Sequence, residues 1–135
     1  MGRECPTHGE VLEVGTSKTI LYLALPGGAE PAREFLEGLP IRDRAKLLSL
    51  IRRMAHHGIT NREQFEQVEE KSPIYAFKAR ALRLLCFHDA SQLILLVGGG
   101  RINRRLREEL VERAERLRQQ YRQGKVSEIA GRRAG

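Results

Sequence analysis

The chain has 135 residues, which is enough for one domain with a modest core. Its hydrophobic share of 41% and charged share of 30% are those of a folded protein and exclude an intrinsically disordered chain. No apolar run approaches the roughly 20 residues that a membrane-spanning helix needs. The first residues lack the apolar segment of a secretory signal, and two cysteines do not make a disulfide framework, so we expect a cytoplasmic protein.

The positive charge is concentrated in the second half of the chain. The formal net charge is +7. Residues 1–70 carry nine basic and eleven acidic side chains, whereas residues 71–135 carry fifteen basic and six acidic ones. Most of the basic residues are arginines, whose planar guanidinium suits phosphate. This distribution favours nucleic acid or an acidic protein as the partner, and the alternative is a solvated surface without a partner.

The first half of the chain predicts an arm, one strand and two helices. Residues 1–17 show no clear period and are expected to form a loose arm, with a short strand near residues 11–14. Residues 18–25 (KTILYLAL) precede Pro-Gly-Gly, which predicts a strand and a turn. A short helix is expected over residues 32–39 and a longer one from Pro40 to Gly58, because its apolar residues recur every three or four positions. Residues 59–72 are polar, with one short helical segment considered near residues 62–68.

The second half predicts three strands and a final helix. The strands are expected over residues 74–78, 82–87 and 92–97, and their short connections favour an antiparallel arrangement. The helix is expected from about Arg105 to Tyr121, followed by a polar tail from Gly124. The apolar stripe of this helix consists of Leu106, Leu110, Ala114, Leu117 and Tyr121.

Taken together, these elements predict one α+β domain. We expect a curved antiparallel sheet with an N-terminal two-helix hairpin and a C-terminal helix, in the order β-α-α-β-β-β-α. The predicted divisions are an arm over residues 1–17, the domain over residues 18–123 and a basic tail over residues 124–135.

Several segments resemble the RelE/HigB-like toxins of type II toxin–antitoxin systems. Residues 74–87 (IYAFKARALRLLCF) resemble their strand pair, in which a basic residue precedes an arginine that enters an apolar strand ending in phenylalanine. Residues 93–99 (LILLVGG) resemble the next strand, and residues 32–40 (AREFLEGLP) resemble the first helix. The resemblance covers roughly residues 18–121 and is nearest to the phage-derived HigB-like branch.

The resemblance implies a RelE-like fold and an endoribonuclease that cuts mRNA, commonly on the ribosome, and that an antitoxin protein inhibits. Cutting RNA through its 2′-hydroxyl needs a base, cations for the phosphorane charge and an acid for the leaving oxygen, without a metal. For the cations we predict Lys78 and Arg80, because alternate positions of a strand share a face, and Arg83, which begins the neighbouring strand. His88 and Tyr75 are the candidate proton carriers. The alternative for the three cations is the solvated face of an amphipathic sheet.

A second basic cluster follows the glycine run at residues 98–100. We predict Arg101, Arg104 and Arg105 as supporting RNA contacts. In the family, two consecutive basic residues usually stand shortly after the glycine, whereas here the sequence is GRINRR. This departure leaves open a relative of the same fold that binds an acidic protein or nucleic acid without cutting it, and also a gyrase inhibitor of the ParE type.

We expect no metal and no cofactor. Candidate metal ligands are Cys5 with His8 and the pair His56-His57. No further ligands follow them at a suitable spacing. The glycine run does not match a phosphate-binding loop, since neither the dinucleotide nor the P-loop pattern is present. Cys86 lies within an apolar strand and is expected to be buried.

Overall fold

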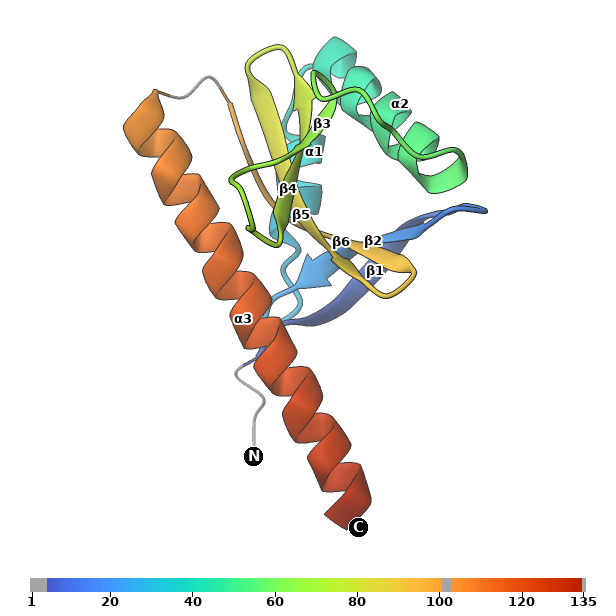
Figure 1. Ribbon diagram of the computed structural model, residues 1–135, viewed down its shortest axis with the longest axis vertical. Coiled ribbons are helices and arrows are strands. Elements are labelled where there is room, and N and C mark those ends of the chain that lie inside the picture. Colours follow the sequence, from blue (N-terminus) through green and yellow to red (C-terminus); the bar gives the residue numbers. More distant parts are fainter. Residues whose placement is uncertain (1–4, 101–102, 135) are drawn as a thin grey trace.

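Six strands form a single sheet, with helices on both of its faces (Figure 1). The computed structural model describes residues 5–100 and 103–134, with side chains described as far as residue 124. The elements in chain order are β1 (Thr7–Val14), β2 (Thr19–Ala24), α1 (Pro31–Glu37), α2 (Ile41–His56), β3 (Phe65–Gln67), β4 (Ile74–Ala79), β5 (Leu82–Asp89), β6 (Gln92–Gly99) and α3 (Arg104–Ala134). The predicted α+β class is confirmed. None of the described helices is long and apolar enough to cross a membrane.

The sheet is mixed, so the expectation of a purely antiparallel sheet is wrong. The strands lie in the order β1-β2-β6-β5-β4-β3. β2 and β6 are parallel, with Ile20 opposite Leu93, and every other neighbouring pair is antiparallel. The physical reason is the crossover through α1 and α2, which carries the chain away from β2 before the meander of β3 to β6 brings it back beside that strand.

Each face of the sheet has its own core. Successive side chains of a strand point to opposite faces, and the two faces are covered by different helices. Leu84 and Cys86 of β5 pack with the cluster formed by α1 and α2. Leu85 and Phe87 of the same strand pack with the cluster that contains Ala114, Leu117 and Tyr121 of α3. A side chain's position along its strand therefore decides which helix it meets.

Three elements differ from those predicted. β1 occupies part of the expected arm and forms one edge of the sheet, and β3 forms the other edge where a short helix was considered. α3 continues to Ala134, although it was expected to end near Tyr121, with a polar tail from Gly124. Gly124 is buried inside the helix, and a Cβ added there would lie 2.6 Å from the Cβ of Cys5. This glycine allows the start of the chain to approach α3 closely and does not stop the helix.

The glycine run is part of β6 for two of its three residues. β6 was expected to end at Val97, but it continues through Gly98 and Gly99. A Cβ added to Gly98 would lie 2.2 Å from the ring of Phe35 on α1. Gly98 thus makes room for an aromatic side chain from the helix that packs on this strand.

Candidate functional site

A pocket lies between the N-terminal half of α3 and the strands β3, β4 and β5. Its charged lining residues are Glu66, Lys78, Arg83 and Arg107. Apolar residues from the strands and from α3 complete the wall: Val68, Ala76, Leu85, Leu110 and Val111. The pocket therefore combines three cations and one carboxylate with an apolar wall.

The sheet places two of the cations directly opposite each other. Lys78 on β4 pairs with Arg83 on β5, and both project toward α3, since Ala76 and Leu85 line the same pocket. Like charges that face each other across antiparallel strands destabilise the sheet. Glu66 offsets the charge of Lys78, whereas Arg83 has no acidic partner among the described residues.

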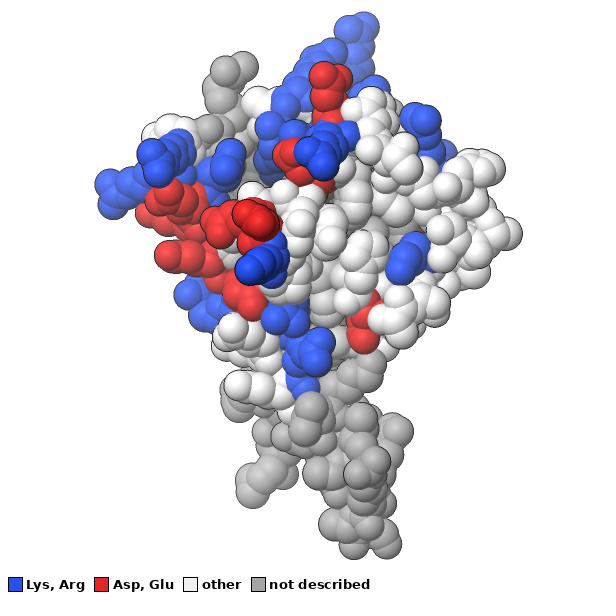
Figure 2. Space-filling model, viewed as in Figure 1, with Lys and Arg blue, Asp and Glu red and all other residues white. Residues whose placement is uncertain are grey.

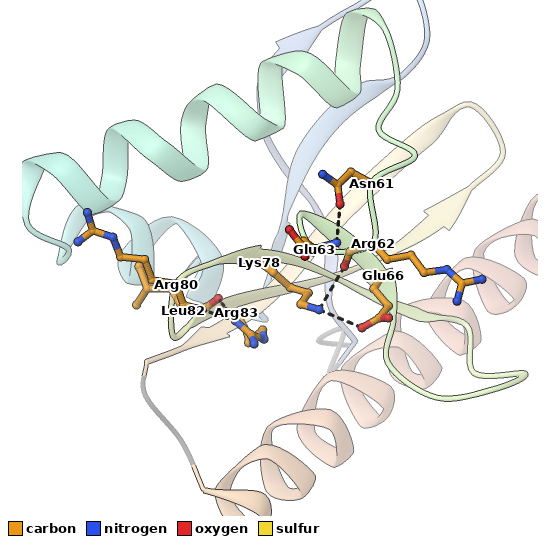
Figure 3. A network of polar contacts seen from close by, with 8 residues as sticks. All are labelled: Asn61, Arg62, Glu63, Glu66, Lys78, Arg80, Leu82 and Arg83. Atoms are coloured by element: carbon orange, nitrogen blue, oxygen red, sulfur yellow. Dashed lines mark hydrogen bonds and ion pairs between the residues drawn. The ribbon is translucent and has the colours of Figure 1, made fainter.

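Glu66 is the acidic partner of Lys78. The Lys78 ammonium donates to Glu66 Oε1 at 3.1 Å and to the Arg62 carbonyl oxygen at 3.2 Å (Figure 3). The hydrogen bond and the charge of Lys78 lower the pKa of Glu66, and Arg62 and Arg107 contribute in the same direction. Glu66 is therefore ionised at neutral pH, and its contact with Lys78 weakens it as a base for as long as that contact lasts.

Arg83 is held by the backbone of the tight turn between β4 and β5. Its Nη1 donates to the carbonyl oxygens of Arg80 and Leu82, each at 2.8 Å. Arg80 itself has a φ of 55° and is exposed at the tip of this turn. Figure 3 shows its side chain pointing away from Lys78. The structure thus brings together Lys78 and Arg83 but not the side chain of Arg80.

Tyr75 and His88 project from the opposite face of the sheet. Two side chains of one strand point to opposite faces when they are an odd number of residues apart. Tyr75 is three residues from Lys78, and His88 is five residues from Arg83. Their rings lie in edge contact at 5.0 Å, and the Tyr75 ring stacks on Phe65 at 5.4 Å. Burial against these neighbours, and then the charge of Lys18, lowers the pKa of His88. The two predicted proton carriers therefore do not line the pocket.

The two described members of the predicted second cluster also lie outside the pocket. Arg104 and Arg105 are exposed at the start of α3, where they form ion pairs with Glu108 at 3.3 Å and Glu109 at 3.4 Å. Arg101 lies outside the described residues.

Two pocket residues were missed by the sequence analysis, namely Glu66 and Arg107. Glu66 stands in a polar segment that gave no clear periodic signal. The position of Arg107 could be read from helical spacing. It precedes Leu110 by three residues and Val111 by four, so it shares the face of α3 that packs on the sheet. The predicted stripe began instead at Leu106, which is exposed, and so passed over Arg107 at the next position.

Among the described residues, no three His, Cys, Asp or Glu side chains are grouped so that they could hold a metal ion. No protein-family model and no curated protein matches the chain. What the protein does must therefore be inferred from the chemistry of its own residues.

Proposed function

We propose that the chain is an endoribonuclease of toxin type and that the pocket beneath α3 is its RNA-cleaving site. The observation that supports this is the set of groups around one pocket: two directly opposed cations, a third from α3, and an ionised carboxylate held by Lys78. Cations stabilise the charge that develops on a phosphate during its cleavage, and a carboxylate accepts the proton of the attacking hydroxyl.

In this proposal the 2′-oxygen of one nucleotide attacks the adjacent phosphorus. Glu66 takes the proton of the 2′-hydroxyl, and Lys78, Arg83 and Arg107 bind the phosphoryl oxygens. The new bond joins phosphorus to the 2′-oxygen, the bond from phosphorus to the 5′-oxygen breaks, and the products are a 2′,3′-cyclic phosphate and a 5′-hydroxyl. The described lining of the pocket contains no imidazole or phenol, so a water molecule gives its proton to the leaving 5′-oxygen. The hydroxide that remains takes the proton from Glu66 and restores the carboxylate.

The wider biological role belongs to the same proposal. The resemblance of residues 74–87 and 93–99 supports a toxin with a RelE-like fold, of the RelE/HigB type, acting in the cytoplasm on translated mRNA and inhibited by a cognate antitoxin. Arg80, Arg104 and Arg105, which are exposed, then serve as outer contacts to RNA. Arg101 belongs to the same proposal from its place in the sequence alone.

Expression in a bacterial host tests this role. We expect the chain to arrest growth and to shorten cellular mRNA, whereas Lys78→Gln and Arg83→Gln variants permit growth. Arg113→Gln, an exposed position on α3 outside the pocket, is the matched control and should remain toxic. If Lys78→Gln and Arg83→Gln were as toxic as the parent, the pocket would not be the site.

A second candidate function is RNA binding without cleavage. The observation that favours it is the location of Tyr75 and His88 on the face away from the pocket, which leaves the described pocket without an imidazole or a phenol. Incubation of the purified chain with free RNA and with translating ribosomes separates the two functions. Binding without cleavage products would support the binding module. In the expression host, intact RNA together with accumulated DNA breaks would support a gyrase inhibitor.

A further inference from the structure

The exposed side of α2 forms a second positive surface. α2 packs on the face of the sheet that α3 does not cover (Figure 1). Arg42, Lys46, Ser49 and Arg53 are all exposed, and at about 100° per residue they fall within about 60° of one another around the helix axis. We call these four residues the α2 stripe. The only acidic residue of the helix, Asp43, lies outside this sector.

The cations of the α2 stripe are not neutralised by neighbouring acids. Among the described residues, no acidic side chain lies within ion-pairing distance of these three cations, and the only polar partner that we find is Gln64, 3.4 Å from Arg53. In contrast, Arg104 and Arg105 at the start of α3 form ion pairs with Glu108 and Glu109, one turn later. Figure 2 shows both signs of charge side by side along the side of the molecule that α3 occupies.

This difference argues against a purely solvating role for the α2 stripe. Like charges four residues apart, such as Arg42 and Lys46, destabilise a helix by a few tenths of a kcal/mol, whereas the glutamate pairs of α3 contribute a similar stabilisation. A helix selected only for solubility and stability would mix its charges as α3 does. The stripe instead offers a continuous positive row of about 16 Å, from Arg42 to Arg53 at 1.5 Å per residue.

The side chains of the α2 stripe suit a polyanion with regularly spaced phosphates. Its members are two arginines, a lysine and a serine, without an aromatic side chain on which an unpaired base could stack. The apolar side of α2 is occupied in the core by Leu47, Leu50 and Ile51, so the helix has no free apolar face to insert into a lipid surface. A straight, rigid row of cations without base-reading groups suits regularly spaced phosphates.

We propose that the α2 stripe binds the phosphate backbone of base-paired nucleic acid, independently of sequence. The proposal goes beyond RNA cleavage, because the stripe and the pocket lie on opposite faces of the sheet and neither requires the other. The protein would then hold a folded, double-stranded region with α2 while a single strand occupies the pocket beneath α3.

The test is the salt dependence of duplex binding by the full chain. The variant replaces Arg42, Lys46 and Arg53 by glutamine. The matched control replaces Arg113, Arg116 and Arg122 by glutamine, which removes the same charge from exposed positions of α3. The probes are a short RNA duplex, a DNA duplex of the same sequence, single-stranded RNA and vesicles of anionic phospholipid. Circular dichroism and thermal unfolding establish that each variant is folded.

We expect the slope of log affinity against log salt for duplex binding to become shallower by about 2.7 in the α2 variant, at roughly 0.9 for each lost phosphate contact. The α3 control should keep the parental slope. Comparison of the two duplexes assigns the natural source of the phosphates to RNA or to DNA. An equal loss in the α2 variant and the α3 control would overturn the proposal, as would binding to vesicles or to single strands alone.

Discussion

The ammonium of Lys78 lies 3.1 Å from a carboxylate oxygen of Glu66, on the face of the sheet that α3 covers. Arg83 stands directly opposite Lys78 on the next strand. A single carboxylate therefore balances one of two facing cations and leaves the pocket with a positive surplus. A phosphate entering this pocket would meet Arg83 and Arg107 and would compete with Glu66 for Lys78, which would release the carboxylate to act as a base.

The first prediction concerns this carboxylate. Replacing Glu66 by Gln keeps the size of the side chain and removes the base. We expect RNA cleavage to fall by about 10²- to 10⁴-fold, which is the usual contribution of a general base. RNA binding should stay equal or become tighter, because a negative charge is lost. Single-turnover cleavage and a filter-binding assay measure the two effects. Glu69→Gln, an exposed position outside this pocket, is the control, and full activity of Glu66→Gln would remove Glu66 from the mechanism.

The second prediction concerns the turn that supports Arg83. Arg80 has a φ of 55°, which costs an L-residue roughly 1–2 kcal/mol, whereas glycine adopts this conformation freely. Glycine relieves this strain, but it also loses more conformational entropy on folding. The net effect of Arg80→Gly should therefore be a stabilisation of about 0.5–1 kcal/mol. Ala81→Gly, at the next position where φ is negative, should destabilise it by a similar amount. Urea denaturation compares the two, and equal destabilisation by both would show that the turn is unstrained.

The third prediction concerns the glycine run. A Cβ on Gly98 would lie 2.2 Å from the Phe35 ring, so we expect Gly98→Ala to cost about 1–3 kcal/mol through overpacking. Gly100 has more room, since its nearest neighbour would be a Leu82 methyl carbon at 3.9 Å. Gly100→Ala should therefore change the free energy of unfolding little. If both variants lost the same stability, backbone freedom and not the contact with Phe35 would explain the glycines.

The fourth prediction concerns pH. The pKa of His88 is lowered from 6.5, first by burial and then by the charge of Lys18. Because the unfolded chain binds this proton more tightly, the contribution of His88 to stability is fully present above pH 6.5 and is lost as the pH falls toward the lowered pKa. The side chain is exposed in part, so water screens it and the loss of stability should be small.

Thermal unfolding of the parent and of a His88→Gln variant across this range measures the effect. The variant should lose less stability on acidification than the parent does. Ser91→Ala, an exposed position near His88 without a titratable side chain, is the matched control and should not flatten the pH dependence. Identical profiles for the parent and His88→Gln would contradict the lowered pKa of His88.

Much of the fold follows from the sequence because it depends on local patterns. The strand at residues 18–25, the α2 helix and the three later strands were expected within a few residues of their observed bounds. The direction of β6 beside β2 could not be derived in this way, because strands far apart in the chain determine it. β3 has only three residues, which is too short for a periodic signal.

The candidate site was predictable only in part, for related reasons. Lys78 and Arg83 were expected as phosphate-binding residues, and the pairing of β4 with β5 brings them together. Tyr75 and His88 were grouped with them by proximity in sequence, but strand alternation directs them to the other face. Glu66 and Arg107 enter the pocket from β3 and α3, through contacts that no local pattern of β4 or β5 reveals.

The most direct test of the central claim is cleavage of a labelled RNA by the purified chain in the presence of a chelator. The substrate is compared with the same RNA carrying a single 2′-deoxy nucleotide at the position of cleavage. We predict cleavage of the all-RNA substrate to a 2′,3′-cyclic phosphate, and no cleavage at the deoxy position. Cleavage of both substrates at the same position, or intact RNA under all conditions including translating ribosomes, would contradict the proposed function.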